Sequence, residues 1–456
     1  MSECSFFDQG LLEKYNTSGP RYTSYPTALE FSDTFTNKDL VSAIQNSINP
    51  DLSLYLHIPF CHSLCYYCGC NKTVTRQKHK ADIYLDYLGQ EIINRARLCS
   101  SKTIRQLHFG GGTPSYLSQQ QLTRIIGLLK EQFYFADDVE MSIEIDPREI
   151  ELELIDHLYF LGFKRISIGV QDTNIKVQQA INRTQSFEFI KQIISRAKSI
   201  GFDSVNIDLI YGLPYQTEQS FKQTLLDAQA LEADRISLFS YAHLPSRFAA
   251  QRKIKDEWLP KAAEKFSLMK QAINTLRQQG YELIGMDHFA KANDELAIAQ
   301  KKGVLHRNFQ GYTTFKNCNL LGFGVSAISA VDNTYSQNCK VLKEYYQSID
   351  EGQQAVEKGL TLSQDDLIRQ RVISELMCNL YVNKKQVSAQ FEIDFDQYFA
   401  EEIDSLKIFE RDNLLINRGS NIQISPSARL LVRNICMSFD AYMKKHLNQQ
   451  RFSRVI

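Results

Sequence analysis

The chain has 456 residues, of which 43% are hydrophobic and 23% charged, and its 52 basic residues are balanced by 52 acidic ones. This length allows two or three domains with a large apolar core, and the balanced charge excludes the strongly basic surface of a typical nucleic-acid binder. No run of about 18 apolar residues could span a membrane, and the acidic residues among the first ten argue against a signal or transit peptide, so we expect a cytoplasmic monomer that binds neither nucleic acid nor membranes.

The first part of the chain, up to about residue 45, is predicted to be an extended arm. Its segment PRYTSYPT, residues 20–27, is too rich in proline and hydroxyl side chains to form a core helix or strand. We therefore expect this segment to lie along other elements and not to build a core of its own.

Six short β-rich segments then alternate with helical segments. The predicted strands are residues 53–58, 104–109, 139–145, 165–170, 204–212 and 235–241, with a first helix at 82–97. Residues 118–133 form a helical pattern opened by a capping box of Ser118 and Gln121, and Gly162 and Gly201 are expected to end two further helices. Repeated strand-helix-strand units indicate an α/β fold, a partial (β/α)6 TIM-like barrel with its functional groups at the carboxyl ends of the strands.

After about residue 335 the pattern becomes mainly helical. We therefore predict three parts: an arm at 1–45, a catalytic barrel domain at 46–335 and a mainly helical C-terminal domain with a small hairpin at 336–456. Ser363 and Asp366 have the spacing of a capping box, and residues 414–425 have the pattern of a hairpin. Winged-helix DNA readers also combine helices with a hairpin, but this region has no basic stripe, so we favour a lid or packing role.

Four of the ten cysteines lie within ten residues, directly after the first predicted strand, in HIPFCHSLCYYCGCNK. Cys61, Cys65 and Cys68 have the spacing C-x3-C-x2-C, and three thiolates on one short loop can hold three irons of a [4Fe-4S] cluster while the fourth iron stays open for catalysis. The alternative is a four-cysteine zinc site, but such sites usually have two C-x2-C pairs separated by a longer insert. We do not count Cys70 as a ligand.

This spacing after the first strand of a barrel resembles the signature of the radical S-adenosylmethionine (SAM) superfamily. Glycine or polar residues also lie at the following strands, in GGGTP at 110–114, SIEIDP with Glu144, IGVQD with Gln171 and NIDLIYGLP with Asp208. Glycine permits the backbone to approach a ligand closely, and strand ends are where a barrel keeps its site.

Over most of its length the chain resembles the family of oxygen-independent coproporphyrinogen III oxidases, also called coproporphyrinogen III dehydrogenases. The shared motifs run from about residue 20 to 330: PRYTSYPTA, LYLHIPFCHSLCYYCGCNK, HFGGGTPSYL, SIEIDPR, ISIGVQD, INRTQ, NIDLIYGLP, FSYAHLP, IGMDHFA, FQGYTT and LLGFGVSAISA. The arm, the CGCNK ending of the cysteine loop and FQGYTT are more specific than the cysteine triplet.

The resemblance implies a [4Fe-4S] cluster on Cys61, Cys65 and Cys68 and two bound SAM molecules, the first of which chelates the open iron. The implied contacts of the first molecule are Tyr55, Gly111, Glu144 and Ile328. Those of the second are Tyr67, Gly112, Thr113, Gln171, Arg183, Asp208 and Ala242. The implied catalytic residues are Tyr55, Glu144, Phe309 and Gln310. Phe is common in the family where Tyr67 stands, and Tyr supplies the same ring face for stacking.

The implied reaction converts two propionate groups of coproporphyrinogen III to vinyl groups, giving protoporphyrinogen IX in haem biosynthesis. A 5'-deoxyadenosyl radical made from SAM removes the hydrogen, and a flavodoxin or ferredoxin is the implied electron donor. Because the substrate carries four carboxylates and the chain is neutral overall, local cations must bind it, and Arg21 is a candidate. We expect His57 to orient the cysteine loop and assign it no proton transfer.

A haem-binding chaperone of the same superfamily is the main alternative. Such relatives keep the cysteine triplet but characteristically lack the PRYTSYPT arm and the CGCNK ending, and this chain has both. The sequence therefore favours the oxidase.

Overall fold

The computed structural model describes residues 9–99, 102–316 and 318–446, and the chain divides into two compact units. The barrel unit, as we call it, consists of Phe31–Tyr281 and Asn317–Thr361. The helical unit consists of Met1–Glu30, Glu282–Lys316 and Leu362–Ile456. These units join segments that are far apart in the sequence, whereas the linear division at residues 45 and 335 stays a prediction.

Parallel strands form the centre of the barrel unit, and all six predicted strands are present. They are β1 (Asp51–Ile58), β4 (Thr103–Gly111), β5 (Tyr134–Ile145), β6 (Arg165–Gln171), β7 (Ser204–Tyr211) and β8 (Arg235–Ser240). Each strand pairs in parallel with the next, so that Tyr55 lies opposite His108 and Gly169 opposite Asp208. The carboxyl ends of these strands therefore lie at the same edge of the sheet.

The sheet also continues on the other side of β1, which the sequence did not lead us to expect. β13 (Asn319–Phe323) pairs in parallel with β1, and β14 (Ile328–Val331), β15 (Thr334–Asn338) and β16 (Val356–Thr361) follow as antiparallel strands. The chain after residue 335 is therefore helical only in part, because β15 and β16 belong to the barrel sheet.

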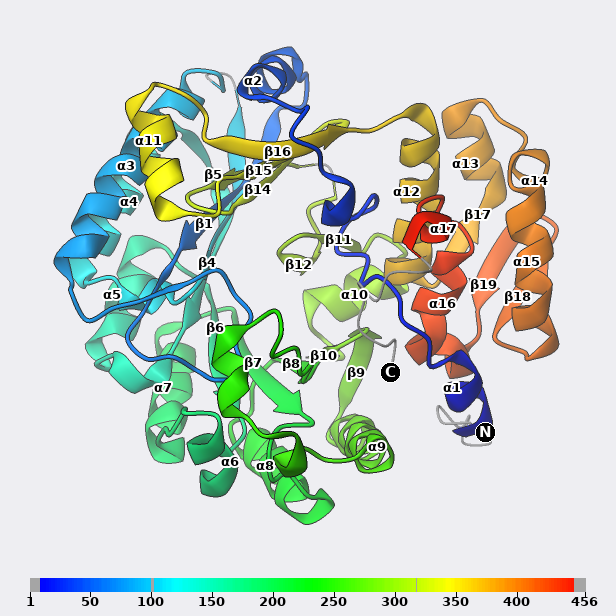
Figure 1. Ribbon diagram of the computed structural model, residues 1–456, viewed down its shortest axis with the longest axis horizontal. Helices are drawn as coiled ribbons and strands as arrows, with labels where there is room; N and C mark the ends of the chain where they lie inside the picture. Colours follow the sequence, from blue (N-terminus) through cyan, green and yellow to red (C-terminus); the bar gives the residue numbers. More distant parts are fainter. Residues whose placement is uncertain (1–8, 100–101, 317, 447–456) are drawn as a thin grey trace. The chain divides into compact units, whose positions relative to one another are not determined.

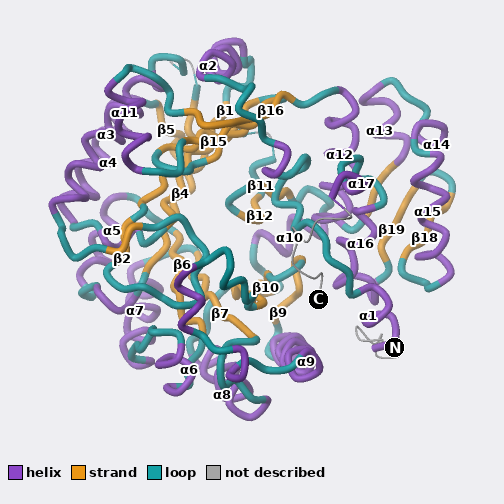
Figure 2. The backbone as a smooth tube through the Cα atoms, in the orientation of Figure 1, coloured by secondary structure: helices purple, strands orange, loops and turns teal. Residues whose placement is uncertain are grey.

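Helices cover the outer face of the parallel strands, where α3, α4, α5 and α7 follow one another (Figures 1 and 2). The helices of this unit are α2 (Asn37–Asn46), α3 (His79–Ala96), α4 (Gln119–Gln132), α5 (Glu153–Leu161), α6 (Ile175–Ala180), α7 (Phe187–Ile200), α8 (Glu218–Ala230), α9 (Ala262–Gln278) and α11 (Leu342–Asp350). Ser118 and Gln121 form the predicted capping box, and Gly162 and Gly201 end α5 and α7 with left-handed backbone, as predicted.

The helical unit contains mostly short elements. Its helices are α1 (Gln9–Tyr15), α10 (Glu295–Lys301), α12 (Gln364–Asn379), α13 (Lys384–Phe391), α14 (Phe395–Tyr398), α15 (Ala400–Arg411), α16 (Val432–Met437) and α17 (Met443–His446). Its strands are β10 (His288–Lys291), β11 (His306–Asn308), β12 (Gly311–Thr313), β17 (Tyr381–Asn383), β18 (Leu415–Arg418) and β19 (Asn421–Ile424), and β9 (Tyr281–Gly285) begins at its boundary. Within the described ranges, no helix is long and apolar enough to cross a membrane.

Two predictions for this unit are confirmed. Ser363 and Asp366 form the capping box of α12, and β18 and β19 pair as the expected hairpin. The arm segment at residues 20–27 has neither helix nor strand, and the Tyr22 hydroxyl anchors it by donating to buried Asp440 Oδ2 at 2.9 Å. The arm was expected to be extended up to residue 45, but it contains the helices α1 and α2. The start of α2 is marked by a capping box at Thr36 and Asp39.

Candidate cluster and cofactor site

The cysteine loop leaves β1 at the carboxyl edge of the sheet, and backbone hydrogen bonds hold it. β2 (Phe60–Cys61) pairs in parallel with β3 (Thr73–Val74) on either side of the loop. Within the loop, Tyr66 N donates to Ile181 O at 3.0 Å. Cys61 and Cys65 are buried, Cys68 is partly exposed and Cys70 is exposed. The predicted ligands therefore project from a loop whose backbone is held by hydrogen bonds to neighbouring segments.

Cys61 is paired with a hydroxyl, and Cys68 with a backbone N–H and the nearby amine of Lys72. Cys61 Sγ lies 3.3 Å from Thr113 Oγ1, and Cys68 Sγ accepts the backbone N–H of Cys70 at 3.4 Å. Hydrogen bonding to Cys70 and the charge of Lys72 outweigh burial and lower the pKa of the Cys68 thiol to about 6, whereas burial raises the pKa of Cys61 to about 11. Cys68 is thus the first of these two sulfurs to become a thiolate, the form in which a cysteine can bind metal.

Cys65 has guanidinium partners instead. Its Sγ accepts from Arg148 Nη2 at 3.3 Å and from Arg183 Nη1 at 3.4 Å. Both guanidinium groups also pair with Asp146 Oδ2, at 2.6 and 3.1 Å. Burial alone would raise the pKa of Asp146, but Arg183 and Arg148 outweigh it and lower this pKa to about 2. Sequence reasoning selected neither Arg148 nor Asp146, although both end the quoted motif SIEIDPR.

The three thiols suit a cluster better than a single ion. Among the residues that the structure describes, no three His, Cys, Asp or Glu side chains lie close enough together to hold one metal ion. Tetrahedral zinc requires its sulfur ligands at about 2.3 Å from one centre, whereas each thiolate of a [4Fe-4S] cluster binds a different iron. This loop also carries His62 and the exposed thiol of Cys70, but the spacing of Cys61, Cys65 and Cys68 fits the cluster that the sequence predicts.

The glycines at the end of β4 allow the backbone to approach the start of the cysteine loop closely. Gly112 N donates to Ile58 O at 2.9 Å, and a Cβ at Gly112 would lie only 2.6 Å from Pro59 O. Gly111 has a φ of +120°, and a Cβ there would lie 2.8 Å from the His57 ring. No side chain fits at either position, so the backbone of this turn packs closely against Pro59 and His57 at the start of the cysteine loop.

Glu144 and Asp208 supply carboxylates from neighbouring parts of the same edge. Glu144 Oε2 accepts the Gly111 N–H at 3.2 Å. Asp208 accepts from Asn206 Nδ2 at 2.9 Å and from Ser167 Oγ at 3.4 Å. Burial, and next the negative charge of Glu144, raise the pKa of Asp208 to about 6. The two carboxylates are therefore close enough to influence each other, and a cationic ligand would stabilise both.

The residues expected around the second SAM molecule are linked by two polar side chains. Arg183 is buried and donates from Nη2 to Gly169 O, at 2.8 Å. Gln251 Nε2 donates to Tyr67 O at 2.9 Å and to Ala242 O at 3.2 Å. Gln171 ends β6 with a positive φ of 65° and is buried. Gln251 was not selected from the sequence, and no motif signal marks it.

Tyr55 is fixed by groups on both sides of β1. Its hydroxyl donates to His57 Nδ1 at 3.1 Å, and His57 Nε2 donates to Asn71 O in the cysteine loop at 3.0 Å. Burial lowers the pKa of His57, so its ring is neutral and orients the loop, the role expected for it. Tyr55 also lies opposite Gly322, where a Cβ would fall 2.4 Å from Ile328 O, so Tyr55 and Ile328 each lie next to this glycine of β13.

Three further predicted residues belong to the helical unit. Phe309 and Gln310 lie at the turn between β11 and β12, where Gln310 N donates to Asn308 Oδ1 at 2.9 Å. Arg21 forms an ion pair with Asp287, which already balances its charge. This pairing weakens the prediction that Arg21 binds a substrate carboxylate.

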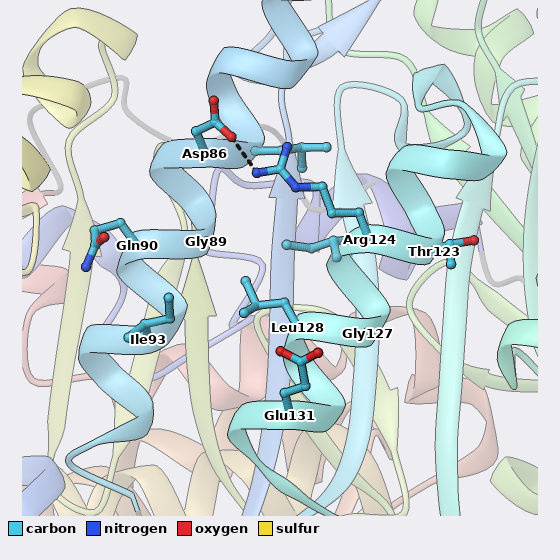
Figure 3. Close-up of a pocket in the computed structure, with 11 residues that line it drawn as sticks. Asp86, Gly89, Gln90, Ile93, Thr123, Arg124, Gly127, Leu128 and Glu131 are labelled. Carbon is cyan, nitrogen blue, oxygen red and sulfur yellow. Dashed lines mark hydrogen bonds and ion pairs between the residues drawn. The ribbon is translucent and has the colours of Figure 1, made fainter.

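A groove on the outside of the barrel unit lies between α3 and α4 and is separate from these groups (Figure 3). It is lined by aliphatic, polar and charged side chains and by Gly89 and Gly127, and Asp86 and Arg124 in it form an ion pair. None of the predicted site residues lines it.

Comparison with known proteins covers nearly the whole chain. Residues 55–228 match the Radical SAM superfamily, and residues 362–431 match the HemN C-terminal domain. The chain is 54% identical to the oxygen-independent coproporphyrinogen III oxidase of Salmonella typhimurium, over 99% of this chain and 98% of that protein. Identity to the Escherichia coli (strain K12) protein of the same name is 53%, with the same coverage. The solved structure of coproporphyrinogen III oxidase (HemN) from Escherichia coli, described as a radical SAM enzyme, aligns with a TM-score of 0.93 at 52% identity, over 96% of this chain and 99% of that one.

Proposed function

The chain belongs to the family of oxygen-independent coproporphyrinogen III oxidases, which are radical SAM enzymes, and on this basis we propose the roles of its residues. Its function is the oxygen-independent decarboxylation of two propionate groups of coproporphyrinogen III to vinyl groups, giving protoporphyrinogen IX for haem biosynthesis. The observation that carries the residue assignment is the cysteine loop, where Cys61 Sγ lies 3.3 Å from Thr113 Oγ1 and Gly112 packs against Pro59.

We propose that Cys61, Cys65 and Cys68 bind the [4Fe-4S] cluster. When bound, the cluster and SAM supply the electron and the 5'-deoxyadenosyl radical that removes a hydrogen atom from the propionate carbon beside the pyrrole ring. The proposed contacts of the first SAM are Tyr55, Gly111, Glu144 and Ile328, and those of the second are Tyr67, Gly112, Thr113, Gln171, Arg183, Asp208 and Ala242. Phe309 and Gln310 are proposed to act on the substrate.

The side chains around the thiols position these ligands. Glu144 leaves 44% of its side chain exposed while it accepts the Gly111 N–H, so it can also accept from the ammonium group of SAM. Neutral His57 holds the cysteine loop through its hydrogen bond to Asn71 O. His57 also accepts from the Tyr55 hydroxyl and thereby fixes the orientation of the Tyr55 ring. Among the described residues, Nε of buried Arg183 has no hydrogen-bond partner, so it can donate to a carboxylate.

Anaerobic turnover tests the proposal. We expect reconstituted protein with coproporphyrinogen III, SAM and a reductant to form protoporphyrinogen IX, methionine and 5'-deoxyadenosine. Cys65→Ser should abolish all three products, whereas Cys318→Ser, which changes a cysteine remote from the loop, should keep them. Product formation by Cys65→Ser would refute the ligand assignment.

We also propose that a flavodoxin or ferredoxin delivers the electron, as is general in the superfamily. A cytoplasmic location is supported by the nine described cysteines, all of which are free thiols, because a reducing compartment keeps thiols unpaired. The monomeric state stays a prediction that analytical ultracentrifugation can check.

A further inference from the structure

Arg148 has no role in the assignment above, although its guanidinium touches a proposed cluster ligand. It lies in the 3-10 turn Pro147–Glu149, directly after β5. Asp146 binds it twice, because Oδ1 accepts from Arg148 Nε at 2.9 Å and Oδ2 accepts from Nη2 at 2.6 Å. Its third nitrogen, Nη1, donates to Asn182 O at 3.2 Å. The guanidinium is therefore held in one orientation, with only 11% of the side chain exposed.

This orientation aims a cation at one sulfur of the loop. Arg148 Nη2 lies 3.3 Å from Cys65 Sγ. Cys61 is paired with a hydroxyl, and Cys68 with a backbone N–H and the nearby amine of Lys72, whereas Cys65 alone of the three receives guanidinium donors. Arg183 also reaches Cys65, but it is proposed to bind SAM, which leaves Arg148 as the donor committed to the sulfur.

We infer that Arg148 raises the reduction potential of the cluster through its charged hydrogen bond to Cys65, and that Asp146 positions it for this purpose. The inference rests on the proposed function, because it requires a [4Fe-4S] cluster on this loop. Reduction adds one electron to the cluster and makes it more negative. A cation and an N–H donor at a ligand sulfur stabilise the reduced form more than the oxidised form, and hydrogen bonds and charge are known to set the potentials of such clusters.

The test is a potentiometric titration of the reconstituted protein, with dithionite as reductant and electron paramagnetic resonance as the readout, in the absence of SAM. We expect the midpoint potential of Arg148→Gln to be more negative than that of the unmodified protein. At the midpoint potential of the unmodified protein, the ratio of reduced to oxidised cluster should be at least tenfold lower in the variant, which corresponds to a shift of about 59 mV for one electron. Arg148→Lys keeps the charge but loses the fork, so its shift should be smaller. Iron content should be unchanged in both.

Arg165→Gln is the matched control, because the Arg165 side chain is similarly buried, at 15% exposure, and pairs with Glu140 at 2.6 Å. Arg165 lies at the amino end of β6, away from the edge of the sheet that holds the cysteine loop. Its midpoint should equal that of the unmodified protein. An unshifted midpoint in Arg148→Gln with full iron content would overturn the inference. Loss of iron in both Arg148 variants would also overturn it, because Arg148 would then hold the loop and not tune the cluster. Absence of any cluster signal in the unmodified protein would instead refute the proposed function.

Discussion

At the scale of single residues, the site depends on positions where a side chain cannot be added. We expect Gly112→Ala to weaken SAM binding, measured by anaerobic calorimetry, because its Cβ would lie 2.6 Å from Pro59 O. The free energy of unfolding should fall by about 1–3 kcal/mol, the usual cost of overpacking. Gly127→Ala on α4 is the control, since a Cβ there meets nothing within 4 Å and Ala should stabilise that helix by up to about 1 kcal/mol. Unchanged SAM affinity in Gly112→Ala would contradict the assignment.

The raised pKa of Asp208 makes stability depend on pH. Its pKa is about 6 in the folded chain against 3.8 ordinarily, so the folded state binds the proton more tightly. The stability from this proton is complete below the ordinary pKa and is lost as the pH rises through about 6. Between pH 5 and pH 8, denaturant unfolding without SAM should show the unmodified protein losing about 1 kcal/mol relative to Asp208→Asn.

The control for this pH dependence is Asp138→Asn, in which the replaced side chain is 85% exposed. It should follow the pH profile of the unmodified protein. Parallel profiles for the unmodified protein and Asp208→Asn would show that Asp208 does not titrate in this range.

At the scale of elements, α3 is joined to the strands added beside β1 by a buried polar network. Glu91 and Arg95 are both almost fully buried and pair at 2.9 Å. Glu91 accepts from Gly324 N and Tyr345 OH, each at 2.7 Å, and Arg95 donates to Asn338 Oδ1 at 2.9 Å. The helix that follows the cysteine loop is thereby fixed to the segment that leads into β14.

Removing one partner of this network should be costly. We expect Arg95→Met to lower the free energy of unfolding by about 3–5 kcal/mol, because it leaves Glu91 as a buried charge without its cation. Arg124→Met breaks the exposed pair with Asp86 and should cost less than about 1 kcal/mol. Chemical denaturation measures both, and equal losses would show that burial of the pair has no energetic weight.

The sequence predicts the six central strands because each is a compact apolar run between clear helical signals, and capping at Ser118 and Ser363 is equally local. It did not predict β13 to β16, which are short strands whose partners lie far away in the sequence, as in the pairing of β13 with β1. Cys61, Cys65 and Cys68 could be predicted as ligands because their spacing is local. Arg148 was missed because only folding brings it to Cys65.

At the scale of the whole molecule, we expect the fold to survive without metal. The pairing of β2 with β3 holds both sides of the cysteine loop, and Tyr84 OH donates to His57 O at 2.6 Å beside it. A cluster that closes only this short loop adds little stability. Removal of iron by a chelator should leave the far-ultraviolet circular dichroism unchanged and lower the thermal midpoint by no more than about 4 °C. Loss of the cooperative transition would show instead that the metal organises the fold, as it does in zinc fingers.

The backbone pairing at the base of the cysteine loop has a consequence for how the cell controls the amount of working enzyme. A chain that is complete before its cofactor arrives can be stored after synthesis and is not degraded as unfolded material. On the expectation that the chain folds without iron, the supply of iron and sulfide, and not translation, would set when a stored chain becomes active.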